Sequence, residues 1–157
     1  MVEKKDKIEG VIYSLPLDIA MNIFQKGKKI FVKYMPHEPT KKTVLKLKKG
    51  MKIYIYISKS NKSVIGEAKI KEIYYMNMQE IIKKFKNNLM ISESELILYA
   101  EGRENKKAQV LDLENITVYP KEITVTIPIT MGGAYVTSIN KRKVFGGIIN
   151  VKKRSKN

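Results

Sequence analysis

The stretch LKKGMKIYIYISKSNKSVIGEAKI, residues 47–70, decides the fold of this chain. After Gly50, isoleucines alternate with tyrosines, so the isoleucines share one face of a predicted strand while Tyr54 and Tyr56 share the other. The polar run KSNKS supplies turn residues, and VIGEAKI returns with a second amphipathic pattern. The stretch therefore predicts a β-hairpin whose isoleucine face is part of the core.

Local signals on either side of the hairpin predict helices. Pro16 suits the first turn of a short helix, and Gly27 is a C-terminal stop for it. Two later segments match capping boxes, in which side chains satisfy free amides of the first helical turn. The paired residues are Asn77 with Glu80 and Ser92 with Glu95.

Further strands complete the predicted sheet. They are expected at residues 8–14, 29–35, 108–119 and 122–129. The class is therefore α+β with mainly antiparallel strands. Because the strands are short and strongly patterned, we expect a small β-pseudobarrel with two to three flanking helices, since closure removes exposed sheet edges.

The charge balance points to an anionic partner. The chain has 31 Lys+Arg against 15 Asp+Glu, which gives a formal net charge of +16. AT-rich codon usage and heat adaptation both favour lysine, but neither predicts so large an excess of bases over acids. A field of this sign attracts polyanions such as RNA over long distances.

Composition also excludes several kinds of site. Cysteine is absent, which removes disulfides, cysteine nucleophiles and thiolate metal sites. The single histidine, His37, lies between two prolines and predicts a surface loop, so we expect no metal and no cofactor. No apolar run reaches the roughly 18 residues of a membrane span, and no secretory signal is present. We therefore expect no membrane partner and a cytoplasmic location.

The order of the elements and the hairpin resemble the PUA-like superfamily, which includes the ASCH and EVE domains. In that superfamily a glycine-led strand ends in an aromatic residue and a serine, and a V-x-G-x-A-x-I strand follows the turn. The matching residues are Gly50, Tyr56, Ser58, Gly66, Ala68 and Ile70. The chain looks most like an uncharacterised archaeal branch, and the resemblance implies a PUA-like β-pseudobarrel.

The resemblance also sets the expected domain organisation. It covers about residues 8–120, which would form the core of a single PUA-like domain over residues 1–157. Residues 121–150 would add a C-terminal strand extension, and residues 151–157 would form a basic tail.

Some ASCH relatives are ribonucleases or amidohydrolases that use a lysine and a glutamate. ASCH domains carry a Gly-x-Lys-x-x-Glu-x-Arg pattern after their first helix. Here Gly27 and Lys29 match, whereas Val32 and Tyr34 stand where the acid and the arginine should be. Because the general base is missing, we expect binding rather than catalysis.

The main functional prediction is an RNA-binding module that recognises a structured RNA or a modified nucleotide through a basic, tyrosine-lined cleft. EVE-like relatives enclose bases with aromatic residues, often tryptophan, which is absent here. Tyrosines would stack on an unpaired base while basic residues hold phosphate or a base edge. The predicted RNA-binding residues are Lys29, Lys33, Tyr34, Tyr54, Ser58 and Arg103.

Alternatives stay open for two of these features. Tyr54 and Tyr56 could instead cover a second apolar layer, as half-buried tyrosines commonly do. Arg103 follows a predicted helix, so it could complement the dipole at the helix C-terminus.

Two other functions are also open. The first is a small hydrolase on the same fold, either an ASCH-type ribonuclease or a modified-nucleoside amidohydrolase, with Lys29 acting beside Glu67 or Glu72. The second is a ribosome- or protein-associated scaffold, which would need the apolar C-terminal segment to form an exposed patch.

Overall fold

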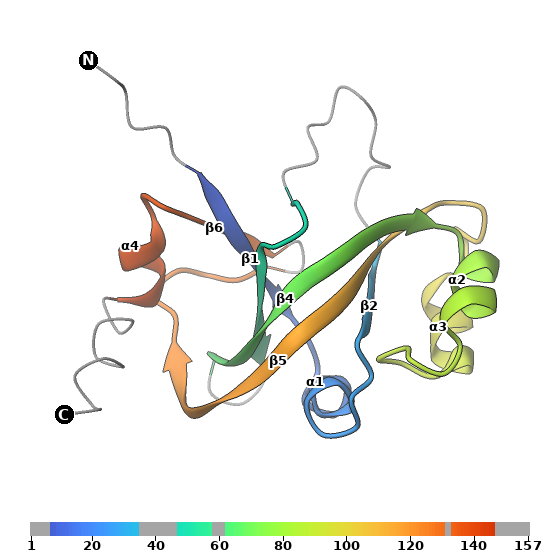
Figure 1. Ribbon diagram of the computed structural model, residues 1–157, viewed down its shortest axis with the longest axis horizontal. Coiled ribbons are helices and arrows are strands. Elements are labelled where there is room, and N and C mark those ends of the chain that lie inside the picture. Colours follow the sequence, from blue (N-terminus) through green and yellow to red (C-terminus); the bar gives the residue numbers. More distant parts are fainter. Residues whose placement is uncertain (1–6, 35–46, 58–61, 131–132, 147–157) are drawn as a thin grey trace, which may run out of the picture.

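The structure is a computed structural model that describes residues 7–34, 47–57, 62–130 and 133–146. Figure 1 shows how its elements are arranged. In chain order they are β1 (Ile8–Ser14), α1 (Leu17–Phe24), β2 (Ile30–Lys33), β3 (Lys52–Ile57), β4 (Ser63–Met76), α2 (Met78–Phe85), α3 (Glu93–Tyr99), β5 (Ala108–Thr124), β6 (Ala134–Thr137) and α4 (Lys141–Phe145). No helix in this part of the chain is long and apolar enough to cross a membrane.

The strands form one six-stranded sheet in the order β2-β5-β4-β3-β1-β6. Neighbouring strands run antiparallel, except that β1 and β3 are parallel. Strands β4 and β5 contain 14 and 17 residues and form a long paired ribbon. In Figure 1, α2 and α3 lie at one end of this ribbon and α4 lies toward the other. The predicted α+β class with mainly antiparallel strands is confirmed.

The described sheet is not closed into a barrel, which corrects the closure expected from the sequence. The turn between α2 and α3 occupies the outer edge of β2. There the Ile30 N–H donates to Asn88 O at 2.9 Å, and the Met90 N–H donates to Ile30 O at 3.0 Å. This turn therefore occupies the backbone N–H and C=O of Ile30, at the start of the edge where a closing strand would pair.

The open sheet still curls around its larger core. Tyr13 of β1 stacks on Phe31 of β2, with ring centroids 5.2 Å apart and planes inclined by 10°, although these strands are not neighbours in the sheet. The Tyr13 hydroxyl also donates a hydrogen bond of 3.0 Å to Gln109 Oε1 of β5. Through these side-chain contacts β1 meets β2 and β5 across the concave face of the sheet, although neither strand is next to β1 in the strand order.

The predicted hairpin is confirmed as β3 and β4, and its two faces lie in different cores. Ile53, Ile55 and Ile57 are buried in the larger core, as the alternation predicts. Tyr54 and Tyr56 are each 5% exposed and belong to a second core. The turn of the hairpin, residues 58–61, lies outside the described residues.

The second core covers the opposite face of the sheet. Its buried members are Ile12, Tyr54, Tyr56, Val64, Tyr119, Ile123, Val136, Val144 and Phe145. Three of them come from β6 and α4, so the C-terminal segment supplies the cover. The sequence predicted only strands beyond residue 120, whereas the structure has a helix, α4, and a strand β5 that continues unbroken to Thr124.

Both predicted capping boxes are present. In α2, the Asn77 side chain accepts from the Glu80 N–H while the Asn77 N–H donates to the Glu80 carboxylate, each at 3.0 Å. Ser92 and Glu95 form the same pair of bonds at the start of α3, at 3.1 and 2.9 Å. The helix starts were therefore predictable from four residues each.

Candidate functional site

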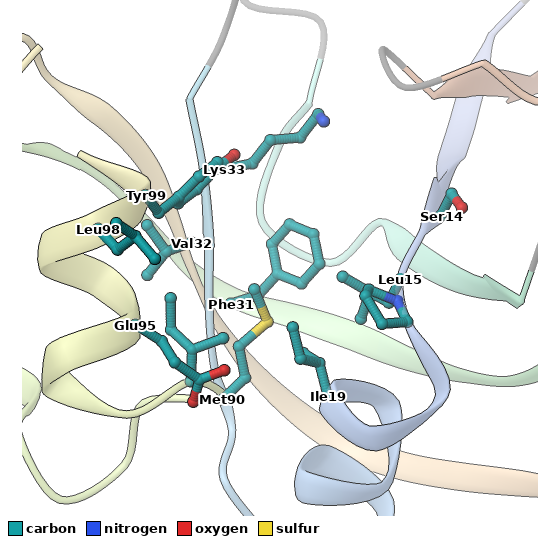
Figure 2. Close-up of a pocket in the computed structure, with 12 residues that line it drawn as sticks. Ser14, Leu15, Ile19, Phe31, Val32, Lys33, Met90, Glu95, Leu98 and Tyr99 are labelled. Atoms are coloured by element: carbon teal, nitrogen blue, oxygen red, sulfur yellow. The ribbon is translucent and has the colours of Figure 1, made fainter. Parts of the chain in front are cut away.

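A pocket of about 370 Å³ lies between the end of β1, the start of α1, strand β2 and helix α3 (Figure 2). This volume falls within the roughly 300–1,000 Å³ of typical small-molecule sites. Its apolar lining consists of Leu15, Pro16, Ile19, Phe31, Val32, Met90, Ile91 and Leu98. Ser14, Lys33, Glu95 and Tyr99 supply the polar groups.

The walls of the pocket follow from local structure. Strand β1 ends at Ser14, and Pro16, with φ −61° and ψ 150°, is the N-cap residue of α1, which begins at Leu17. The Leu15 N–H donates to Tyr56 O at 2.9 Å, which fixes this corner on β3. On the opposite side, the capping box sets the start of α3. Strand β2 lies between these walls and forms the floor.

Lys33 marks one end of the pocket. Its ammonium nitrogen lies 5.1 Å from the centroid of the Tyr13 ring, a cation–π distance. Burial, and to a smaller degree the neighbouring Arg103, lowers the pKa of Lys33. A partly dehydrated ammonium beside a second cation is suited to an anionic or strongly polar ligand group.

Arg103 caps the end of α3. Its Nε and Nη2 donate to Tyr99 O at 3.1 and 3.0 Å, so the helix C-terminal role considered for this arginine is confirmed. Its guanidinium also stacks 4.3 Å from the Tyr34 ring centroid and 4.8 Å from that of Tyr99. The bonds to Tyr99 O use some of the five N–H donors of the Arg103 guanidinium. The predicted contact between Arg103 and RNA stays a prediction.

Tyr34 is a core residue in the structure and not an open stacking platform. It is 6% exposed, and its ring meets that of Tyr99 edge-on, with centroids 5.1 Å apart. Arg103 also packs on it. The Tyr34 hydroxyl is buried without a hydrogen-bond partner among the described residues, and burial raises its pKa. Tyr99, half-buried and part of the pocket lining, is the better placed aromatic ring.

The residues of the hydrolase alternative belong to separate ion pairs. Lys29 pairs with Asp112 at 3.5 Å, and Glu72 pairs with Lys49 at 2.6 Å. Glu67 pairs with Lys52 at 2.9 Å and accepts a hydrogen bond of 2.7 Å from Tyr119.

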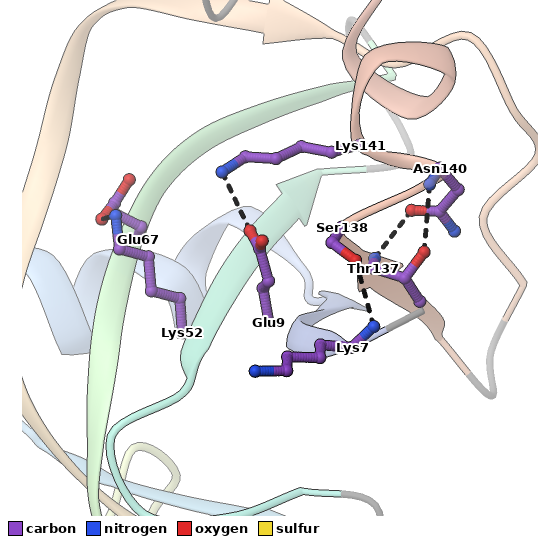
Figure 3. A network of polar contacts seen from close by, with 8 residues as sticks. All are labelled: Lys7, Glu9, Lys52, Glu67, Thr137, Ser138, Asn140 and Lys141. Carbon is purple, nitrogen blue, oxygen red and sulfur yellow. Dashed lines mark hydrogen bonds and ion pairs between the residues drawn. The ribbon is translucent and has the colours of Figure 1, made fainter. Parts of the chain in front are cut away.

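Figure 3 shows Glu67 and Lys52 near the network of β1, β6 and α4, where Lys141 binds Glu9 at 2.9 Å. The structure therefore does not join Lys29 to Glu67 or Glu72 in an ion pair, and none of the three lines the pocket. Within the described ranges, no cluster of acids and histidine could hold a metal ion.

Tyr54, another of the predicted RNA-binding residues, does not line the pocket. Tyr54 packs against Phe145 in the second core, with ring centroids 5.2 Å apart, so the alternative of a second apolar layer describes its position. Ser58 lies outside the described residues, as does His37.

Several lysines lie on the α1–β2 loop and around the end of α2, shortly before Met90 of the pocket lining in the chain. Helix α2 carries Lys83 and Lys84 in its last turn, and Lys86 follows. The Lys28 ammonium donates to Asn87 O at 2.7 Å, which fastens the α1–β2 loop to this helix end. We call Lys26, Lys28, Lys83, Lys84 and Lys86 the basic edge.

Sequence reasoning missed Glu95 and Tyr99 as site residues. A signal was present, because α3 reads ESELILY and is apolar on more than one side. Leu96 is fully buried, whereas Ile97 and Leu98 are 48% and 70% exposed. A short helix that exposes apolar residues in addition to its buried face indicates a surface that a ligand can cover.

The sequence matches the family model described as Domain of unknown function (DUF365) over residues 8–138, which is most of the chain. The chain belongs to this family. An uncharacterized protein, MJECS03, from the archaeon Methanocaldococcus jannaschii is 36% identical over 96 residues, covering 55% of this chain and 89% of that protein. The DUF365 match includes β6 and ends before α4.

The fold of this DUF365 chain is shared with ASCH domains. ASCH from Zymomonas mobilis superposes with a TM-score of 0.70 at 19% identity, covering 86% of this chain and 92% of that one. A mutant form of the same protein gives a TM-score of 0.61 at 21% identity, covering 76% and 77%. The predicted resemblance to the PUA-like superfamily is thereby confirmed at the level of the fold.

Proposed function

We propose that this DUF365 protein binds RNA by taking an unpaired base into the pocket. The observation that supports this best is the pocket's composition: an apolar interior beside the half-buried ring of Tyr99, with the Lys33 ammonium at one end. A base that stacks on an aromatic side chain gains about 1–3 kcal/mol, whereas a phosphate needs cations around it. The interior therefore suits a base and excludes a phosphate.

Phosphates would bind outside the pocket on basic residues that flank it. Lys33 and Arg103 serve one end, and the basic edge serves the other. Each contact releases counterions from the RNA, so these lysines supply affinity without sequence preference. The formal net charge of +16 supplies the long-range attraction.

The target class is a nucleotide that is not stacked in a helix. An unpaired position in a structured RNA and a nucleotide with a modified base both meet this requirement, because each is costly or impossible to read inside an A-form duplex. Leu98, an exposed apolar residue of α3 that lines the pocket, would cover such a base once it has entered.

The other functions receive less support. A hydrolase of the ASCH type needs a lysine and an acid together, and Figure 2 shows the Lys33 ammonium and the Glu95 carboxylate at opposite ends of the pocket. A scaffold would need an exposed apolar C-terminal patch, yet Val144 and Phe145 are each 1% exposed in the second core.

Salt dependence tests the proposed function. The affinity for a single-stranded RNA should fall steeply as salt rises, with a log–log slope of about −0.7 for each phosphate contacted. Lys33→Ala should lower the slope by roughly one contact. Lys121→Ala, at an exposed position near the far end of β5, is the matched control and should leave the slope unchanged. A salt-independent affinity in filter-binding titrations would refute RNA binding by this surface.

A further inference from the structure

Among the described residues that line the pocket, Glu95 is the one carboxylate. Its position is fixed by the capping box of α3: Oε1 accepts from the Ser92 N–H at 2.9 Å, and the Glu95 N–H donates to Ser92 Oγ at 3.1 Å. A carboxylate has room for further hydrogen bonds after accepting one. Glu95 therefore presents an oriented, solvent-exposed acceptor in the pocket lining.

The same contact also favours the ionised form of Glu95. The Ser92 backbone N–H, and after it the Ser92 hydroxyl, lowers the pKa of the Glu95 carboxyl. The group is then ionised at neutral pH, and an ionised carboxylate can accept hydrogen bonds but cannot donate them.

The two charged residues of the pocket are separated. Figure 2 shows the Lys33 ammonium at one end and the Glu95 carboxylate at the other, with Phe31 and Met90 between them. A ligand that fits this arrangement carries acceptors or negative charge toward Lys33 and N–H donors toward Glu95. A nucleotide has both, in its phosphate and in the amino group of its base.

We propose that Glu95 selects a base whose pairing edge carries an amino group, as in cytosine, and discriminates against uracil; this inference rests on the proposed RNA binding. A carboxylate accepts from the exocyclic amino group of cytosine. Uracil presents a carbonyl oxygen at that position, which would repel the carboxylate. A good contact of this kind favours the matching base by roughly five- to 150-fold, and the exposure of Glu95 places the expected preference near the lower end, at about tenfold.

The test compares a cytidine octamer with a uridine octamer by fluorescence anisotropy at one salt concentration and pH 7.5. Both are single-stranded pyrimidine oligomers with the same phosphates, so they differ mainly at the base edge. The wild-type protein should bind the cytidine octamer about tenfold more tightly. Glu95→Gln should bring the two affinities close together, because a glutamine amide donates as well as accepts while still completing a capping box.

Glu80→Gln is the matched control. It makes the same change in the other capping box, on α2, and Glu80 does not line the pocket. The tenfold preference should therefore survive it, and thermal unfolding of both variants should confirm that they are folded.

Two results would overturn the inference while leaving RNA binding intact. In the first, both octamers bind equally to the wild-type protein with the expected salt slope. In the second, Glu95→Gln keeps the full cytidine preference. If neither octamer binds at low salt, the proposed function fails together with the inference.

Discussion

Replacing Tyr34 by alanine should lower the free energy of unfolding by about 3–5 kcal/mol, as removal of a large buried aromatic side chain does. Tyr34 is 6% exposed and packs on both Tyr99 and Arg103, so the variant would leave a cavity at the end of α3. Urea unfolding followed by circular dichroism measures the loss as a lower midpoint with an unchanged slope.

Tyr34→Phe separates the ring from the hydroxyl. The hydroxyl is buried without a hydrogen-bond partner in the described part of the chain, and such a group costs free energy. The phenylalanine variant should therefore be as stable as the wild-type protein or more stable by about 1 kcal/mol. If Tyr34→Ala instead kept wild-type stability and lost RNA affinity, Tyr34 would be the stacking residue and its assignment to the core would be wrong.

Replacing Phe145 by alanine should have a similarly large effect, about 3–5 kcal/mol. Phe145 lies on α4, is 1% exposed, and packs against Tyr54 of β3 with ring centroids 5.2 Å apart. The C-terminal segment would then be an integral layer of the single domain we propose for residues 1–157, because the second core depends on it.

Ile139→Ala is the control for the same segment. Ile139 is 63% exposed, so its truncation should change the free energy of unfolding by no more than about 0.5 kcal/mol. Equal small effects from both variants would show that α4 does not stabilise the sheet. The account of Tyr54 as a covered residue would then fail, and its predicted role in base stacking would regain support.

The hairpin and the helix starts were accessible from sequence because short-range chemistry sets them. Alternation along β3 determines which side chains share a face. Each capping box involves side chains only three residues apart, and both form as predicted.

What covers the tyrosine face could not be predicted in the same way. Tyr54 meets Phe145 only after the whole sheet has formed. Barrel closure was expected from a general rule about exposed edges, but the α2–α3 turn fills the edge of β2 locally. Whether a turn takes the place of a closing strand depends on how that turn packs against the sheet edge, and no periodic pattern in the sequence encodes this packing.

The site was partly predictable. Lys33 and Arg103 were named from their residue types and neighbours, and they lie close enough for Arg103 to lower the pKa of Lys33. Tyr34 was predicted to stack on a base, whereas the structure buries its ring, because an aromatic residue beside lysines has the same sequence pattern in a core and in a cleft. Glu95 was recognised as part of a capping box. That it also lines the pocket could not be predicted, because this depends on how β2 and α3 lie against each other.

Ultraviolet crosslinking to a single-stranded RNA at physiological salt, followed by tryptic digestion and mass spectrometry, tests the central claim most directly. Residues 30–33 and residues 87–103 are each bounded by tryptic sites, and together they contain Phe31, Lys33, Glu95 and Tyr99. If a base enters the pocket, the crosslinks should fall on these two peptides. Crosslinks confined to peptide 53–59, which carries Tyr54 and Tyr56, would contradict the account.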